Sequence, residues 1–155
     1  MKLNAIIFDF SRTLLFPKDT TYTGGLNKRY AEVKEKPNFV FTDYFTFNDE
    51  LITYLESHQD AWTVHILSSK VIQDDPAVQK HIGHLFLNIY SALRIGKKKT
   101  DPELYRIVSE KINEQPGHVC YVDDKQKNLS AASSAGMMAI HYTNNTQLIA
   151  DLKKL

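Results

Sequence analysis

The sequence has little cysteine, no long apolar run and almost no surplus charge, and each shortage excludes a class of protein. Its single cysteine, Cys120, excludes an internal disulfide framework and fits a reducing compartment. No apolar run approaches the ~18 residues that a membrane-spanning helix requires, so we expect no membrane partner. Lys and Arg number 19 against 18 Asp and Glu, a net charge of +1 that argues against a broad nucleic-acid-binding surface.

The length and composition predict one globular domain. The chain has 155 residues, of which 43% are hydrophobic and 24% charged, the size and composition of one ordinary domain. Asp9 interrupts the N-terminal apolar run and no small-residue cleavage site follows, which argues against a signal peptide. We find no repeat and no linker. We therefore predict a single cytoplasmic domain over residues 1–155.

Short apolar runs alternate with helical patterns along most of the chain. The runs are close to continuously apolar, as expected for strands buried on both faces of a parallel sheet. Strand, helix and strand in alternation predict an α/β fold, a doubly wound parallel sheet. The predicted strands are residues 5–8, 62–67, 86–90, 118–122 and 138–141.

Several helix ends can be read from the sequence. Thr46 to Asp49 has the pattern of a capping box. Asp101-Pro102 predicts the start of a helix, and Gly136 predicts the end of another. The C-terminal helix is predicted from an apolar stripe, which consists of Leu148, Ile149, Leu152 and Leu155.

Residues 14–45 depart from this alternation. They contain Pro17, Gly24, Gly25 and Pro37 but no clean period, so we expect a loop or hairpin excursion with one short helix over residues 26–33. The segment is rich in aromatic residues, for which core packing is the default interpretation. A flap that contacts substrate is the alternative.

Polar and charged residues follow four of the predicted strands. Asp9 follows the first strand, Ser68-Ser69 the second, and Asp123-Asp124 the fourth, while Lys99 precedes the helix that starts near Asp101. Ligands of open α/β sheets bind beyond the carboxyl ends of the strands, so we expect these side chains to converge. Carboxylate oxygens suit Mg²⁺, and a hydroxyl with a lysine suits a phosphoryl group.

In this order the motifs resemble those of the haloacid dehalogenase-like hydrolase superfamily, over nearly the whole chain. Residues 8–13, Phe-Asp-Phe-Ser-Arg-Thr, resemble the first motif, Asp-x-Asp-x-Thr, with its second aspartate replaced by Ser11. Residues 66–69 are similar to the second motif, residues 99–105 to the region of the third-motif lysine, and residues 122–124 to the fourth motif.

The resemblance implies a phosphatase that acts through an aspartyl phosphate. Asp9 would attack phosphorus, Ser68 and Lys99 would bind the phosphoryl group, and Thr13 would brace the loop. Arg12 and Ser69 are further candidates for contact with the substrate. Mg²⁺ would be bound by Asp124 with Asp123 beside it, together with Asp9 and the backbone carbonyl of Ser11.

Ser11 departs from the family pattern in a way that bears on turnover. The aspartate usual at this position protonates the leaving group and then activates water, and a serine hydroxyl is too weak an acid and too weak a base for either task. Loss of a general acid–base typically costs 10²–10⁴-fold in rate. A regulatory or interaction protein that binds phosphate but has lost turnover is therefore the alternative to an active hydrolase.

The sequence also lacks room for the helical cap domain that many superfamily members insert. We therefore expect an open site that accepts a phosphorylated small molecule or a phosphoryl group exposed on a larger substrate. Alternatively, a second copy of the chain could cover the site as a homo-oligomer. A dehalogenase is disfavoured because Asp123-Asp124 is present and the cap is missing.

Overall fold

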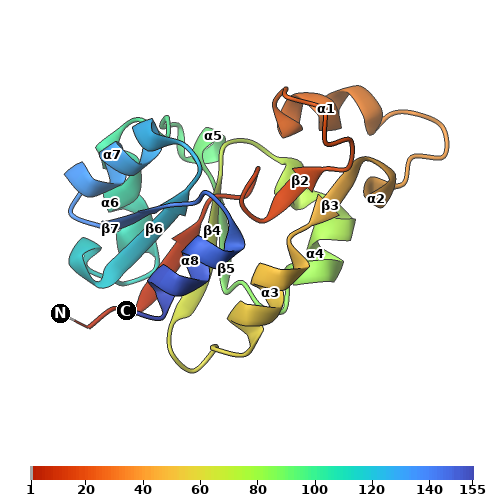
Figure 1. Ribbon diagram of the computed structural model, residues 1–155. Coiled ribbons are helices and arrows are strands. Elements are labelled where there is room, and N and C mark those ends of the chain that lie inside the picture. The colour runs from red at the N-terminus through yellow and green to blue at the C-terminus, as the bar shows by residue number, and fades with distance from the viewer. Residues whose placement is uncertain (1) are drawn as a thin grey trace.

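A five-stranded sheet, in which all strands run parallel, forms the centre of the computed structural model, which describes residues 2–155. The strands are β1 (Ala5–Phe8), β4 (Thr63–Ser68), β5 (Asn88–Ser91), β6 (Val119–Asp123) and β7 (Met138–His141). Their order across the sheet is β5-β4-β1-β6-β7, so β1 lies at the centre (Figure 1). All five predicted strands exist, each within two residues of its predicted bounds.

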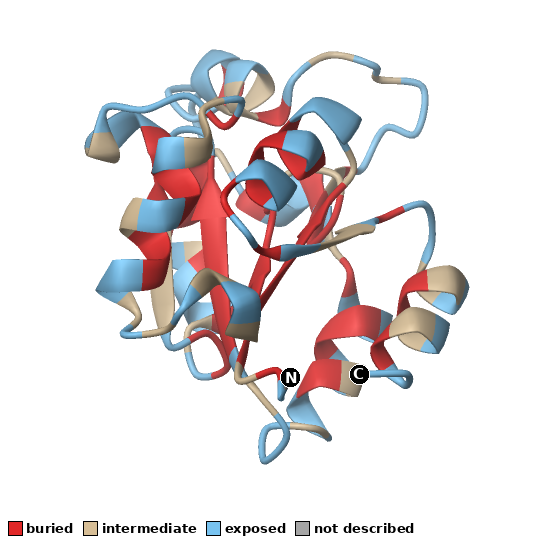
Figure 2. Ribbon diagram, turned by 90° about the vertical axis from the view of Figure 1, so that its left-hand side faces the viewer, coloured by how far each residue is buried: buried red, intermediate tan, exposed pale blue. Residues whose placement is uncertain are grey.

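Helices cover both faces of the sheet, and the alternation of side chains along β1 explains why. Ile6 and Phe8 pack into one apolar cluster with α3 (Asp49–Glu56), α4 (Pro76–Ile82) and α8 (Asn145–Leu152). Ala5 and Ile7 pack into the other, with α6 (Pro102–Lys111) and α7 (Gln126–Ser134). The buried residues accordingly concentrate in the central strands and on the inner sides of the helices (Figure 2). The predicted doubly wound α/β fold is confirmed.

The excursion after β1 forms a small unit of its own. It consists of β2 (Leu15–Pro17), α1 (Leu26–Val33), α2 (Phe41–Tyr44) and β3 (Phe45–Phe47). Strands β2 and β3 pair antiparallel (Figure 1). Helix α1 has the bounds that the sequence predicts. Aromatic rings pack inside the unit, with the centroids of Phe41 and Phe45 4.9 Å apart. The hairpin ends at residue 47 rather than 45, because β3 continues to pair with β2 up to that residue.

The helix ends show two corrections to the sequence analysis. Asn48, not Thr46, caps α3, and its side chain accepts from the backbone N–H of Leu51. Thr46 cannot act as the cap because its backbone lies in β3, opposite Phe16. Leu155 lies beyond the end of α8 and is exposed. The predicted start of α6 at Asp101 and the end of α7 before Gly136, with a φ of +98°, are confirmed.

Shorter elements complete the described chain. They are the 3₁₀ turns η1 (Ile72–Asp74) and η2 (Pro116–His118) and the four-residue helix α5 (Ala92–Ile95). Cys120 is buried in β6, and this burial raises the pKa of its thiol to about 12, as expected for an inert core residue. Within residues 2–155, every helix is too short or too polar to cross a membrane.

Candidate active site

The carboxyl ends of β1, β4 and β6 bring the predicted residues to one edge of the sheet. Phe8 is level with Ile66 of β4 and with Val122 of β6, so the residues that follow lie side by side. The backbone N–H of Asp9 donates to the carbonyl of Val122 at 2.8 Å. Parallel pairing therefore fixes the position of Asp9 between the second and fourth motifs.

Asp9 and Lys99 form a buried ion pair at the centre of this edge. Their relative exposures are 5% and 7%, and the Lys99 ammonium also lies 3.6 Å from Oδ2 of Asp123. The phenol of Tyr105 donates to the Lys99 carbonyl at 2.7 Å, which fixes the lysine backbone. Burial raises the pKa of Asp9 to about 7, against the opposing charge of Lys99. One ammonium group thus does not fully compensate the carboxylates that surround it.

The three aspartates form a cluster in which Asp123 and Asp124 have different surroundings. One carboxylate oxygen from each of Asp9, Asp123 and Asp124 lies within 4.8 Å of the others. Oδ2 of Asp123 accepts from the phenol of Tyr121 at 2.5 Å and from Nδ2 of Asn128 at 2.9 Å, and its Oδ1 accepts from the backbone of Lys125 at 2.8 Å. Donors therefore already occupy both oxygens of Asp123.

The carboxylate of Asp124, by contrast, has an oxygen that is available to a cation. Among residues 2–155, its buried Oδ1 has no hydrogen-bond partner. Burial and the neighbouring Asp123 raise the pKa of the Asp124 carboxyl. A divalent cation would satisfy this oxygen and relieve the repulsion with Asp9, so the donor set fits Mg²⁺. The amide of Asn128 holds Asp123 in place.

The loop after β1 carries Ser11, Arg12 and Thr13. Ser11 lines the cavity beside Asp9. Arg12 has a positive φ of 60°, and its Nη2 donates to the carbonyls of Tyr22 at 3.1 Å and Gly24 at 2.7 Å. The half-buried guanidinium is thus not fully free for a phosphate, since its Nη2 holds the excursion against the site. Thr13 braces the loop through its backbone carbonyl, which accepts from Asn48 at 2.8 Å.

Two buried hydroxyl groups at this edge lack a partner among residues 2–155. They are Oγ of Ser68, at the end of β4, and Oγ1 of Thr13. An unsatisfied buried hydroxyl costs about 1–3 kcal/mol, and a phosphoryl oxygen beside Ser68 would remove that cost. The next residue, Ser69, is exposed and lines the cavity.

The cavity over Asp9 is narrower than a fully open site, because the excursion forms one of its walls. Its volume is about 170 Å³, and residues 23–26 line it opposite Lys99 and Asp124. Residues 23–26 of the excursion face the site, and a flap that contacts substrate stays a prediction for this stretch. The aromatic rings pack in the core of the unit instead, as the default interpretation predicts.

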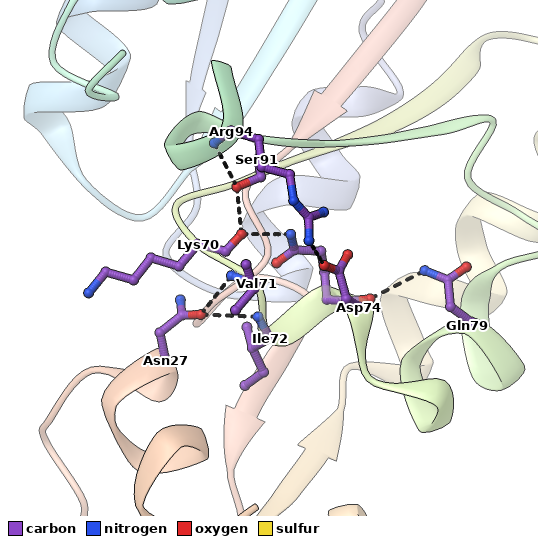
Figure 3. A network of polar contacts seen from close by, with 9 residues as sticks. Asn27, Lys70, Val71, Ile72, Asp74, Gln79, Ser91 and Arg94 are labelled. Carbon is purple, nitrogen blue, oxygen red and sulfur yellow. Dashed lines mark hydrogen bonds and ion pairs between the residues drawn. The ribbon is translucent and has the colours of Figure 1, made fainter. Parts of the chain in front are cut away.

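The excursion is fixed in this position by its contact with the loop after β4. Oδ1 of Asn27, on α1, accepts from the backbone N–H groups of Val71 and Ile72 at 3.3 and 3.1 Å (Figure 3). In the same loop, the Lys70 carbonyl accepts from the Ser91 hydroxyl at 2.6 Å. Tyr30 of α1 donates to Asp75 at 2.8 Å. These contacts join the excursion to the second-motif loop and set the width of the cavity.

Comparison with known proteins identifies the family. A sequence profile described as haloacid dehalogenase-like hydrolase matches residues 17–142, which is most of the chain. The chain belongs to this hydrolase family. The match begins after the loop that contains Asp9 and Ser11, so the assignment rests on the rest of the haloacid dehalogenase-like chain.

Solved structures of similar proteins support the fold of this haloacid dehalogenase-like hydrolase. An enzyme of the same family from Bacteroides thetaiotaomicron, in complex with magnesium and inorganic phosphate, has a TM-score of 0.71 at 13% identity over 94% of this chain and 98% of that chain. A hydrolase from Streptococcus pneumoniae TIGR4 has a TM-score of 0.71 at 16% identity over 99% of this chain and all of that chain.

A sequence relative of this haloacid dehalogenase-like hydrolase is the sesquiterpene phosphatase astK of Aspergillus oryzae. The two are 32% identical over 71 residues, which is 46% of this chain. The matched segment spans 36% of the length of that phosphatase. The likeness thus extends to about a third of the relative.

Several residues of the site escaped sequence reasoning. Asn48, Tyr121 and Lys125 hold the site residues but lie outside the four motifs. Residues 23–26 line the cavity, although their sequence carries no signal beyond two turn-forming glycines. For these residues the one signal in the sequence was the phenol of Tyr121, a polar group within a predicted apolar strand. Lys97 and Lys98 are exposed, whereas Lys99, which the resemblance assigns to the site, is buried.

Proposed function

We propose that this chain is a Mg²⁺-dependent phosphohydrolase in which Asp9 attacks the phosphorus atom. One observation carries the proposal: the buried Asp9 carboxylate is held by Lys99 next to Asp124, whose Oδ1 has no partner among residues 2–155. The phosphatase relative and the magnesium and phosphate in the Bacteroides structure support it. A phosphorylated small molecule is the proposed substrate, and the proposed site belongs to one domain over residues 1–155.

The side chains have distinct proposed roles. Asp9 is the nucleophile, and Lys99 holds its carboxylate and neutralises the phosphoryl oxygens. The unpartnered Ser68 hydroxyl, with Ser69 beside it, donates to the phosphoryl group. Asp123, whose oxygens are occupied, positions Lys99 through their 3.6 Å contact.

The metal would be held by Asp9, Asp124 and the backbone carbonyl of Ser11. When bound, Mg²⁺ supplies positive charge to the phosphoryl oxygens and to the carboxylates. In this proposal Asp123 stands beside the ion rather than directly on it, because its two oxygens already accept three hydrogen bonds.

Ser11 supports a second candidate function, a phosphate-binding regulatory protein with slow or lost turnover. Its hydroxyl lines the cavity where a carboxylic acid would otherwise serve as proton donor. The two functions differ in the fate of a phosphorylated Asp9. A hydrolase releases the phosphoryl group to water, whereas the regulatory protein retains it.

The experiment is a pulse with acetyl phosphate and Mg²⁺, followed over time by intact-protein mass spectrometry. We expect one added phosphoryl group that decays, none in Asp9→Asn, and an unchanged result in the control variant Asp43→Asn, whose side chain is exposed and does not line the cavity over Asp9. Ser11→Asp should accelerate the decay by about 10²-fold or more. Absence of the adduct together with turnover that persists in Asp9→Asn would exclude the proposed mechanism. An adduct that is stable for hours would favour the regulatory function.

A further inference from the structure

The cavity over Asp9 continues into a second hollow that is basic. The second hollow has a volume of about 450 Å³ and lies at the start of α7. Lys99, Lys125, Ser69 and Asn128 line both spaces, so the two are contiguous. Lys127 also lines the second hollow, and no acidic residue does. A substrate whose phosphoryl group reaches Asp9 therefore has its remainder beside lysines.

Two of the three lysines that line this hollow, Lys125 and Lys127, are available for a ligand. The backbone N–H of Lys125 donates to Oδ1 of Asp123 at 2.8 Å, which anchors the residue at the edge of the site, while its side chain is exposed. In residues 2–155, the lysines that form ion pairs are Lys97, Lys99 and Lys154. The ammonium groups of Lys125 and Lys127 thus form no ion pair with the described residues, although the charge of Lys125 acts on the nearby Asp124.

The same two spaces lack a free carboxylic acid or imidazole to protonate a leaving group, and a lysine ammonium is a much weaker acid than either. Their only carboxylates are Asp9 and Asp124, which belong to the acidic cluster, and among the described residues that line them there is no histidine, cysteine or tyrosine. The hydroxyl of Ser11 is too weak an acid for this task. A leaving group that departs as an anion next to positive charge therefore suits these spaces better than one that needs a proton.

We propose that the substrate is a diphosphate, from which the protein removes the terminal phosphoryl group. A phosphate oxygen is a far weaker base than an alkoxide, because the second pKa of a phosphate monoester is about 6. It can leave without a proton, and Lys125 with Lys127 stabilises its charge through charge-assisted hydrogen bonds. This inference rests on the proposed function and names its substrate class.

The chemistry balances without another reactant besides water. An oxygen of Asp9 forms a bond to the terminal phosphorus, the bond from that phosphorus to the bridging oxygen breaks, and the electron pair stays on the departing phosphate monoester. Water then attacks the phosphorus of the aspartyl phosphate. This step restores the Asp9 carboxylate and releases inorganic phosphate, and the proton passes to solvent.

The test compares n-butyl diphosphate, n-butyl phosphate and acetyl phosphate with the full chain and Mg²⁺. Phosphorus NMR should show n-butyl phosphate and inorganic phosphate as the products from the diphosphate. The kcat/KM for the diphosphate should exceed that for n-butyl phosphate by about 10²-fold or more, since only the monoester needs a proton on its leaving oxygen. Equal values for the two butyl compounds, or butanol and pyrophosphate as products, would overturn the inference.

Variants of the two lysines test the second hollow directly. Lys125→Met with Lys127→Met should lower the ratio of kcat/KM for the diphosphate to that for acetyl phosphate by about 10-fold or more, because hydrogen bonds to charged groups are the stronger ones. Lys125→Arg should restore most of the ratio. Lys98→Met, an exposed lysine outside both spaces, should leave it unchanged.

Two further outcomes separate this inference from the proposed function. Methylenediphosphonate should bind the parent about 10-fold more tightly than the double methionine variant in calorimetry, which is a readout independent of turnover. A ratio and an affinity that both stay unchanged in the double variant, with Asp9-dependent hydrolysis of acetyl phosphate intact, would refute the diphosphate alone. If the parent neither hydrolyses acetyl phosphate nor forms the Asp9 adduct, the diphosphate inference and the proposed function are both refuted.

Discussion

The side chain of Asn48 connects the loop after β1 to two helices, so its loss should cost more than the loss of a helix cap. Nδ2 donates to the carbonyl of Thr13 and to Oδ1 of Asn145, both at 2.8 Å. Oδ1 accepts from the N–H of Leu51 at 3.3 Å and from Nδ2 of Asn145 at 2.8 Å. Asn48 is buried, and so is Thr13.

The expected cost of Asn48→Ala has two parts. Removal of the cap of α3 costs about 1 kcal/mol. The substitution also leaves the buried Thr13 carbonyl without its side-chain donor, which costs about 1–2 kcal/mol more. Asn145 retains a bond to Glu50 at 2.7 Å, so we assign it no separate cost. The free energy of unfolding should therefore fall by about 2–3 kcal/mol.

Asn144→Ala is the matched control, because Asn144 is also an asparagine that caps a helix. It is exposed, and its Oδ1 accepts from the N–H of Gln147 at 2.9 Å. We expect a loss of about 1 kcal/mol for this variant. Urea unfolding of both variants, followed by far-ultraviolet circular dichroism, measures the difference. If the two variants lose equal stability, the buried bond to Thr13 contributes nothing and the reasoning fails.

Three further predictions concern the metal, the strained loop and a buried histidine. Mg²⁺ at ten times its Kd should raise the free energy of unfolding by about 1.4 kcal/mol and shift Tm upward. The shift in Tm should persist in Asp43→Asn and largely disappear in Asp124→Asn. A shift in Tm that persists in Asp124→Asn would exclude this residue from the metal site. Arg12 has a φ of 60°, so Arg12→Gly should be about 1 kcal/mol more stable in urea than Arg12→Ala, which loses the same hydrogen bonds but keeps the strain; equal stabilities would contradict the strain. Burial lowers the pKa of His65 to about 4, whereas the pKa of a histidine in the unfolded state is near 6.5. Between these two pH values the unfolded state binds a proton that the folded state does not bind. The free energy of unfolding should therefore fall by up to about 3 kcal/mol between pH 6.5 and 4. His65→Gln should flatten that decline in urea titrations at several pH values, and an unaltered slope would argue against a neutral buried His65.

The sequence predicted the strands and the convergence of their ends well, because both depend on local patterns. The run of residues 5–8 is apolar at every position, and all four residues are buried in the central strand. Parallel pairing then brings the residues after each strand to one edge, as the general rule for open α/β sheets requires. Asp9, Ser68 and Lys99 could therefore be placed together from spacing and motif order alone.

The sequence could not distinguish the surroundings of Asp123 from those of Asp124. Neighbouring side chains at the end of a strand point to opposite sides, so adjacent identical residues meet different partners. Tyr121 and Asn128 reach Asp123, and Asp124 is left with an unpartnered oxygen among residues 2–155. The direction of β6 relative to α7 decides which of the two aspartates receives these hydrogen bonds.

Contacts between segments distant in sequence were equally hidden. Asn27 meets Val71 and Ile72, and Asn48 meets Asn145. These asparagines carry no motif, since an asparagine in a loop or a first turn usually serves only its own helix. The docked position of the excursion, and hence the width of the cavity, therefore emerges only from the three-dimensional structure.

The central position of β1 also has a consequence for how the chain folds during its synthesis. The strand is made first, yet it needs β4 on one side and β6 on the other, both far along the chain. At about 5–20 residues per second, several seconds separate the synthesis of Ser68 from that of Asp123. During that interval one edge of an entirely apolar strand stays unpaired, which favours aggregation unless a chaperone binds the strand. The strand that precedes Asp9, the proposed nucleophile, is thus the segment with the longest exposure before the fold is complete.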